Sequence, residues 1–468
     1  MFKAIFTNSF GILFSRILGF FRDLLTASVL GASVYSDIFF IAFKLPNLFR
    51  RIFAEGAFTQ FFIPAFARSR HKAVFSIHIF LVFSLITLLI TLFVNLTPQL
   101  FTKAITTGFD AQTIAIAAPY VAINFWYLPL IFAVTFLASI LQYKHHFATT
   151  AFATALLNLS LIAALLLSRN QESSQIVYYL SFAVVIGGIL QLFVHLIAIY
   201  KMGLFKLLFG GFKYLHKKSS LIKEDTKKFR SNFFPAIWGN STAQISAFLD
   251  TFLASFLATG SISYLYYANR IFQLPLALFA IATSVALFPR VARYLKNADE
   301  AKALQNLQKA FWFLSFLLTA STIGGIVLSH EIIFFLFERG AFGSADTEYT
   351  AAVLMMYLIG LLPFGLQKLF VLWLYAKEQQ MRAAKVATIS LLVYIIFALA
   401  FIQPFGVAGL ALASTLGGFV SLFFTLKIFG WQNFFAILRS KNLLYLFAGS
   451  LLFTALLVVL KDFISAYI

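Results

Sequence analysis

Long apolar segments recur along the whole chain, and this repetition constrains the fold more than any other feature. About thirteen of them reach the length of about 20 apolar residues that spans the hydrocarbon core of a bilayer. Only 11% of the 468 residues are charged and 61% are hydrophobic, whereas soluble domains average about 25% charged residues. We therefore predict an all-α polytopic membrane protein with spans at 4–30, 34–66, 73–97, 114–142, 147–168, 176–201, 231–258, 263–290, 307–328, 349–376, 384–402, 406–428 and 443–466.

The basic residues are distributed unevenly between the two sides of the predicted membrane. Of the 36 Lys and Arg residues, 25 lie in alternate loops, and only four lie in the opposite loops or at the C-terminus. Cytoplasmic loops are enriched in Lys and Arg, so this asymmetry predicts a cytoplasmic N-terminus and an external C-terminus. The net charge of +20 is thus a topology signal. Attraction to anionic membrane lipids follows from it, and a nucleic-acid partner is not expected.

A proline-bearing pattern occurs twice, in the second and the eighth predicted spans. Leu45-Pro46 is followed by PAFAR at 64–68, and Leu274-Pro275 is followed by PRVAR at 289–293. Both prolines are expected to kink their helices. The second copy lies six spans after the first, an even number, so both halves enter the membrane the same way round, as in the parallel repeats of secondary transporters. The repeat predicts six-helix lobes at 1–200 and 231–428, a basic cytoplasmic linker at 201–230 and an additional transmembrane helix within 429–468.

Eleven charged residues lie inside the predicted spans. Each would cost about 2.5–3.5 kcal/mol at the centre of an inserted helix, so most are expected to line a polar cavity or to pair with one another. Seven are basic and four acidic, a balance of +3, and arginine offers a permanently charged planar fork that suits phosphate. The balance predicts an anion site for phosphate or pyrophosphate. The residues are Arg16, Arg22, Lys44, Arg50, Arg51, Arg270, Lys368, Asp23, Asp37, Glu55 and Asp250.

Structural roles compete with substrate binding for some of these charges. Arg51 and Glu55 are four residues apart on one helix face, where an ion pair is about as plausible as a substrate role. Asp37 stands near the outer end of its span and is able to cap or to be solvated there. Lys368 lies close enough to the cytoplasmic end to extend its ammonium group to the membrane surface.

The first span holds a further pairing. Asp23 follows Arg16 by seven residues on the same helix face and is expected to neutralise it in part. Arg16, Arg50 and Arg270 have no acid three or four residues away, so local pairing does not account for them.

Enzymatic chemistry finds little support. The chain has no cysteine, and its seven histidines show neither HxH nor HExxH spacing, so a metal site is not expected. No nucleophile elbow or Walker loop is present. We predict a protein that is not an enzyme and that needs no cofactor.

Several stretches resemble the MurJ (MviN) family of lipid II flippases, within the multidrug/oligosaccharidyl-lipid/polysaccharide exporter superfamily. The resemblance is dense over residues 15–66, where PNLFRRIFAEGAF is the most specific part, and it returns in QISAFLDTFLASFLATGSISYLYYANRIFQLPLALFA at 244–280. FERGAF at 337–342, and more loosely LYAKEQQMRAAK and GVAGLALASTL, extend it across both halves.

This resemblance implies two six-helix bundles and C-terminal helices that form a groove for a lipid tail. It implies transport of an undecaprenyl-pyrophosphate-linked peptidoglycan precursor, lipid II, across the bacterial inner membrane by alternating access, in a protein expected to act as a monomer. The cavity arginines of the family fall on Arg16, Arg22, Arg50 and Arg270. Other motif positions fall on Ser15, Asp23, Asp37, Asn47 and Glu55, and the acid associated with a coupling cation falls on Asp250.

Three departures from the family pattern bear on these expectations. Lys44 stands where members commonly have arginine. The sequence has room for one C-terminal helix beyond the twelve, where the family has two, which puts the lipid-tail groove in question. Ser390 and Tyr394 occupy the eleventh span where an acid or amide would strengthen a cation site, so coupling to Na⁺ and coupling to the membrane potential both stay open.

We expect Arg50 and Arg270 to clamp the pyrophosphate from opposite halves, and Arg16 and Arg22 to draw the headgroup in. Asp23 and Glu55 would hold arginines in place and weaken binding enough for release. Two alternatives stay open: a flippase for another undecaprenyl-linked glycan, and a cation-coupled small-molecule exporter of the same superfamily. The exporter would be expected to line its cavity mainly with acids, opposite to the balance of +3.

Overall fold

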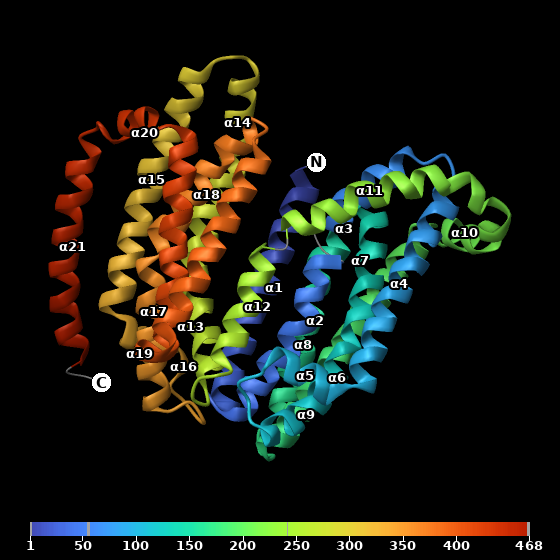
Figure 1. Cartoon of the computed structure of the whole chain (residues 1–468), viewed down its shortest axis with the longest axis horizontal. Coiled ribbons are helices and arrows are strands. Elements are labelled where there is room, and N and C mark those ends of the chain that lie inside the picture. The colour runs from blue at the N-terminus through green and yellow to red at the C-terminus, as the bar shows by residue number, and fades with distance from the viewer. Residues whose placement is uncertain (1, 54–56, 241, 466–468) are drawn as a thin grey trace. The chain divides into compact units, whose positions relative to one another are not determined.

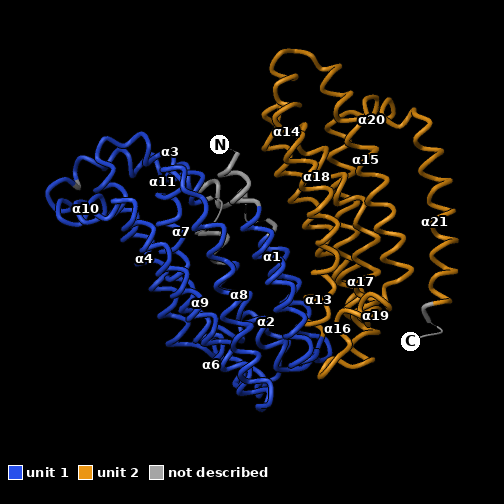
Figure 2. Tube along the Cα trace, turned by 180° about the vertical axis from the view of Figure 1, so that it is seen from behind, with its two compact units in different colours: residues 1–260 blue, residues 261–468 orange. Residues whose placement is uncertain are grey.

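The computed structural model describes the backbone of residues 2–53, 57–240 and 242–465. Within these ranges it also describes all side chains except those of residues 2–9, 49–53, 57, 219, 234–240, 242–243 and 464–465. The chain forms two compact units, Met1–Gly260 and Ser261–Ile468 (Figure 2). Each unit is a bundle of helices, and the described backbone contains no strand.

The first unit contains long helices joined by short turns (Figure 1). They are α1 (Phe2–Leu30), α2 (Val34–Phe53), α3 (Ala57–Arg68), α4 (Lys72–Leu96), α5 (Pro98–Ile105), α6 (Ala111–Phe125), α7 (Tyr127–Tyr143), α8 (Ala148–Ser168), α9 (Ser173–Lys201), α10 (Phe205–Lys218), the 3₁₀ turn η1 (Ser219–Ile222), α11 (Lys223–Asn240) and α12 (Thr242–Ala254).

The second unit has the same all-helical character. Its helices are α13 (Ser261–Pro275), the π-helix η2 (Leu276–Ile281), α14 (Ala282–Lys296), α15 (Glu300–Val327), α16 (Ser329–Phe337), α17 (Ser344–Ile359), α18 (Leu361–Ala376), α19 (Gln380–Phe429), α20 (Trp431–Leu438) and α21 (Asn442–Ser465).

Nine helical segments among the described residues are long and apolar enough to cross a membrane. They coincide with ten of the thirteen predicted spans, because α19 joins two of them into one helix of 50 residues. The other three predicted spans, 4–30, 34–66 and 231–258, each include side chains that lie outside the described set. The all-α polytopic fold predicted from hydropathy is confirmed.

The boundary predicted between 384–402 and 406–428 is visible inside α19. Gly406 has φ +53° and ψ −134°, so the backbone turns there although helical hydrogen bonding continues on both sides. Residues other than glycine rarely adopt this backbone conformation. Pro404, two residues earlier, has no N–H to donate to a helical hydrogen bond. Two spans therefore meet at a sharp bend instead of at a loop.

The two repeated prolines are accommodated differently. Pro46 lies inside α2, which continues as an α-helix to Phe53. Pro275 ends α13 and is followed by the π-helix η2, so the expected irregularity appears there as a widened turn. π-bulges in helices are a recognised cause of bending.

Phenylalanine rings fill the core of the first unit and decide where that unit ends. Phe58 of α3 is fully buried, and its ring centroid lies 5.6 Å from that of Phe83 and 6.3 Å from that of Phe229 of α11. Phe233, also of α11, lies 5.2 Å from Phe83. These contacts place α11 with the first unit, and that unit extends through α12 to Gly260, later in the chain than the predicted lobe boundary of 231. The lobe division follows the internal repeat and stays a prediction about symmetry.

The C-terminal region contains one span after α19. α20 has eight residues, too few to cross a bilayer, and α21 is the additional long helix. In Figure 1, α21 runs beside α15 at the edge of its unit.

Candidate functional site

A ladder of polar contacts joins α1 to α8 inside the first unit. Ser15 Oγ donates to the carbonyl of Ala151 (3.2 Å), and Thr154 Oγ1 donates to Ser15 Oγ (2.8 Å). Asn158 Nδ2 donates to the carbonyl of Ser15 (2.9 Å). Small residues allow this close approach, because a Cβ built on Gly11 would lie 2.8 Å from Ala151 Cβ. We call the contact surface between two packed helices a seam. Ser15, predicted to bind substrate, therefore lies in the α1–α8 seam.

Arg22 continues the ladder and is almost fully enclosed. Its side chain donates to Asn158 Oδ1 through Nη1 (3.0 Å), and to Asp23 Oδ1 through Nε (3.1 Å) and Nη2 (2.5 Å). Arg22 is 6% exposed and Asp23 is 1% exposed. The guanidinium carbon also lies 5.5 Å from the centre of the Phe43 ring of α2. A permanent cation is thus held in fixed orientation inside a span, with its charge balanced by its neighbour.

The partner of Asp23 differs from the expected one. Asp23 forms its ion pair with Arg22, not with Arg16. Seven helical residues rise about 10 Å, which is a long distance for two side chains to bridge along one helix. Arg16 instead has an exposed side chain on α1.

Asp37 ties the start of α2 to the end of the first unit. Its side chain is 3% exposed, and Oδ2 accepts a hydrogen bond from the backbone N–H of Gly260 (2.8 Å). Gly260 has φ +89°, a conformation that favours glycine. The carboxylate thus accepts from the segment before α13, and its burial disagrees with the solvated position considered for Asp37.

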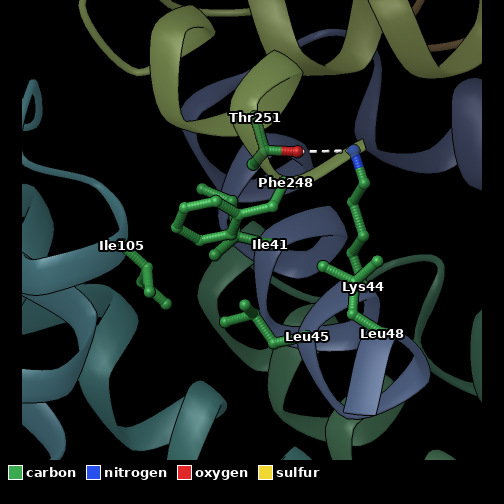
Figure 3. Close-up of a pocket in the computed structure, with 7 residues that line it drawn as sticks. All are labelled: Ile41, Lys44, Leu45, Leu48, Ile105, Phe248 and Thr251. Atoms are coloured by element: carbon green, nitrogen blue, oxygen red, sulfur yellow. Dashed lines mark hydrogen bonds between the residues drawn. The ribbon is translucent and has the colours of Figure 1, made fainter. Parts of the chain in front are cut away.

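Lys44 is directed towards α12. Its Nζ donates to Thr251 Oγ1 (2.5 Å), alongside a small apolar pocket (Figure 3). The pocket is lined by Ile41, Lys44, Leu45, Leu48, Ile105, Phe248 and Thr251. Asp250, the predicted coupling acid, is half-buried and directly precedes Thr251 on α12. The amine of Lys44 is thus held by the residue next to that acid.

Asn47 adds a side-chain hydrogen bond to the backbone of α2 next to Pro46. Its Nδ2 donates to the carbonyl of Phe43 (2.7 Å), four residues earlier. Because Pro46 has no N–H, the helix is weakened at this turn, and the amide adds a side-chain hydrogen bond beside it.

Arg270 lies on α13 in the second unit. Its Nη2 donates to Tyr266 Oη (2.6 Å), and its guanidinium carbon lies 4.8 Å from the centre of the Tyr266 ring. An aromatic ring attracts a cation placed over its face. Lys368 of α18, in the same unit, has an exposed side chain.

Three predicted residues cannot be placed. The side chains of Arg50 and Arg51 and all of Glu55 lie outside the described residues. The pairing of Arg51 with Glu55 and the clamp role of Arg50 therefore stay predictions.

The sequence analysis identified charged residues of the spans but did not predict the polar residues that form hydrogen bonds with them. Asn158, Thr251 and Tyr266 each contact a basic residue of a span, and none of them was predicted. A signal existed for Asn158, because it is an isolated amide in the apolar run LLNLSLIAALLL of α8, where a polar side chain needs a partner. Among the described residues no group of three His, Cys, Asp or Glu is placed to hold a metal.

Comparison with known proteins identifies a family. The family model for the lipid II flippase MurJ matches residues 26–466. A curated protein of Helicobacter pylori (strain J99), named "Probable lipid II flippase MurJ", is 51% identical over 422 residues, covering 88% of this chain and 92% of its own. One of Aquifex aeolicus with the same name is 34% identical and covers 88% and 80% of the two chains.

Solved structures agree with the sequence comparison. A structure titled "Lipid II flippase MurJ, inward closed conformation" superposes with a TM-score of 0.79 at 28% identity, covering 98% of each chain. An inward-facing multidrug transporter of the MATE family has a TM-score of 0.70 at 12% identity and covers 94% of this chain and 99% of its own, which indicates a shared fold alone. The predicted resemblance is confirmed, and this chain belongs to the MurJ family of lipid II flippases.

Proposed function

We propose that this protein moves lipid II, the undecaprenyl-pyrophosphate-linked peptidoglycan precursor, from the inner to the outer leaflet of the bacterial cytoplasmic membrane. It belongs to a flippase family and is a transporter, not an enzyme. The observation that carries the proposal is Arg22, a permanent cation that is 6% exposed in α1 and held in orientation by Asp23 and Asn158. A guanidinium fixed in this way is suited to recognise pyrophosphate oxygens.

The basic residues of both units act on the pyrophosphate in this proposal. Arg16, whose side chain is exposed on α1, attracts the headgroup, and Arg22 binds it with a preset geometry. Asp23 offsets part of the Arg22 charge, so that the anion is held weakly enough to be released. Arg270 supplies the cation of the second unit, kept in place by Tyr266.

The remaining binding residues are proposed from the family motif. Arg50 and Asn47 belong to the binding set, and Arg51 and Glu55 support it. In this proposal the two halves of the chain alternately open the binding site to the cytoplasm and to the outside. The N-terminus lies in the cytoplasm, and the protein acts as a monomer.

The proposed test is rescue of cells depleted of their own lipid II flippase, with lipid II exposure measured at the periplasmic face. Arg270→Ala should abolish rescue at normal protein level, because the phosphate-binding fork is lost. Arg339→Ala is the matched control, since Arg339 is an exposed arginine of the same unit that follows α16 and donates to two carbonyls in the last turn of that helix. Rescue by Arg270→Ala equal to that of the control would remove Arg270 from the site. Failure of the wild-type chain to rescue, despite normal insertion, would contradict the proposed substrate.

Coupling is proposed to act through Asp250, driven by Na⁺ or by the membrane potential. Lipid II exposure is to be measured in proteoliposomes with each gradient imposed separately. Asp250→Asn should abolish the response to the gradient that drives transport. If this variant keeps the full Na⁺ dependence of the wild type, Asp250 is not the Na⁺-coupling residue.

A further inference from the structure

Helix α10 has three distinct faces, although it lies in the basic segment that follows the sixth predicted span. Residues three and four apart share a helix face, and this periodicity separates an aliphatic face, a phenylalanine face and a lysine face. The aliphatic face contains Leu207, Leu208, Gly211 and Leu215 and is buried or half-buried. The two other faces are exposed, and together they define a surface that the fold of this unit leaves open.

The aliphatic face packs against the first turns of α4. A Cβ built on Gly211 would lie 2.3 Å from the carbonyl oxygen of Ala73 and 2.5 Å from Ile77 Cγ1. α4 begins at Lys72 and is a candidate membrane span. Five residues of helix rise about 7.5 Å, so α10 lies against the end of a span, at the level where hydrocarbon gives way to lipid headgroups. Figure 1 shows α10 beside α4, at the turn of the chain that leads into α11.

The phenylalanine face is composed of Phe205, Phe209 and Phe212, and the exposed His216 follows them at the C-terminal end of the same face. Their side chains are 53%, 63% and 50% exposed, and the rings of Phe205 and Phe209 stack with centroids 6.5 Å apart. Three large aromatic side chains on one face of a helix that contains four lysines would be costly to leave in water. At the end of a membrane span they have an apolar environment within reach.

The lysine face is turned by about 100° from the phenylalanine face, one residue further round the helix. Lys206, Lys213 and Lys217 occupy it, and all three are exposed. Lys213 and Lys218 also approach the ring of Tyr214, at 5.8 and 5.4 Å from its centre. Aromatic rings next to a row of lysines are typical of helices that lie in the membrane interface.

We propose that α10 is an interfacial anchor that binds an anionic lipid leaflet. The three phenylalanines enter the acyl region, and the three lysines bind lipid phosphate groups. A nucleic acid or an acidic soluble protein would match the lysines alone, whereas a lipid surface matches both faces and the position at the end of α4. The anchor fixes the segment after α9 to the membrane while transport proceeds.

The chain has no cysteine, so a single introduced thiol can be labelled without background. The full-length Phe209→Cys protein, labelled with a polarity-sensitive nitrobenzoxadiazole probe, is placed in nanodiscs of phosphatidylcholine alone or mixed with phosphatidylglycerol. The emission should shift to the blue, and the probe should be protected from aqueous iodide, more strongly in the anionic discs. In the Lys206→Gln/Lys213→Gln/Lys217→Gln background, the ratio of embedded to water-exposed probe in anionic discs should fall at least about fivefold, the factor expected for one basic residue near such a surface.

The matched control removes the same charge elsewhere in this segment. Lys223, Lys227 and Lys228 are exposed on α11, and their triple change to Gln should leave the probe embedded. An equal loss in both triple variants would show that only overall charge matters and would overturn the anchor. A probe that iodide quenches fully in both kinds of disc would overturn it as well. Phe212→Cys provides a second label position, on the same face, should labelling at 209 disturb the helix.

Discussion

The seam between α1 and α8 and the seam between α15 and α21 hold helices together in opposite ways. The first is joined in mid-span by hydrogen bonds through Ser15, Asn158 and Arg22. In the second, Gly324 of α15 faces Leu457 and Phe453 of α21, and Lys461 Nζ near the end donates to the carbonyl of Val327 (3.0 Å) and lies 3.6 Å from Glu331 Oε1. Polar contacts inside a membrane fix one register, because a displaced helix would leave them unsatisfied, whereas apolar contacts tolerate sliding. The contacts between α1 and α8 therefore fix the orientation of side chains such as Arg22, whereas the contacts between α15 and α21 hold the C-terminal helix against its unit.

The largest effect is expected from removing the cation of the first seam. Arg22→Ala takes away the guanidinium that faces Asp23, and breaking a buried ion pair costs about 3–5 kcal/mol. The thermal midpoint of the protein in nanodiscs should fall sharply, and transport should be lost.

A double variant separates folding from transport at this position. Arg22→Ala/Asp23→Ala removes both charges and should recover much of the thermal stability without recovering rescue. Arg169→Ala, at an exposed arginine beyond α8, should change neither measurement. If the double variant rescued growth, Arg22 would be a structural residue and not a binding one.

A smaller effect is expected at Asn158, which positions Arg22. Asn158→Leu removes an acceptor for Arg22 and a donor to the carbonyl of Ser15. Losing such buried hydrogen bonds costs about 1–3 kcal/mol. We expect weaker binding of an undecaprenyl-pyrophosphate ligand, measured by titration in nanodiscs.

Asn158→Gln and Thr154→Val serve as comparisons. Asn158→Gln retains an amide and should restore part of the affinity. Thr154→Val removes the contacts of Thr154 Oγ1 to Ser15 Oγ and to the carbonyl of Ala151, neither of which involves Arg22, and should leave the affinity unchanged. Unaltered affinity in Asn158→Leu would show that Asn158 stabilises the seam without orienting Arg22.

Two glycines allow a direct test of how closely each seam is packed. A Cβ on Gly11 would lie 2.8 Å from Ala151 Cβ, so Gly11→Ala forces α1 and α8 apart. A Cβ on Gly324 would lie 3.9 Å from Leu457 and from Phe453, an ordinary contact.

Gly11→Ala should lower the thermal midpoint, with a cost of about 1–3 kcal/mol for overpacking. Gly324→Ala should leave the midpoint unchanged or raise it, because alanine favours a helix by about 1 kcal/mol over glycine. Equal midpoints for the two variants would mean that the two seams do not differ in packing.

The fold could be predicted from the sequence because each membrane span can be recognised from its own residues. A run of about 20 apolar residues has one stable arrangement in a bilayer, and charge asymmetry between loops adds a predicted direction. Ten of the predicted spans therefore coincide with candidate membrane helices among the described residues, including the two that meet at Gly406 without a loop.

The candidate site was harder to predict, because the pattern of charges in the sequence identifies charged residues but does not show which residues contact them in the fold. Arg22 was identified, yet Asn158 stands 136 positions further along the chain, and only packing of α1 on α8 brings them together. The expected pairing of Asp23 with Arg16 was wrong for a local reason, since the neighbouring Arg22 reaches the same carboxylate. The internal repeat did not predict that α11 and α12 belong to the first unit. A sequence repeat reflects symmetry between the two halves of the chain, whereas the division into units reflects which helices are in contact.

The smallest effect is expected at the end of the second seam. Lys461→Met keeps most of the apolar length of the side chain and removes the amine that contacts Glu331 and Val327. Glu331 is buried, but Lys461 is 40% exposed and its Nζ lies 3.6 Å from the carboxylate, so solvent screens the pair from the lysine side and we expect it to contribute about 1 kcal/mol. Amide hydrogen exchange in α21 should become faster, while the exchange of α1 and α8 and the rescue of growth stay at wild-type values. Lys461→Arg, which restores a cation, should return α21 to its original protection. If exchange instead rose equally in α1, α8 and α21, the C-terminal helix would be coupled to the polar seam, and the contrast between orientation and attachment would not hold.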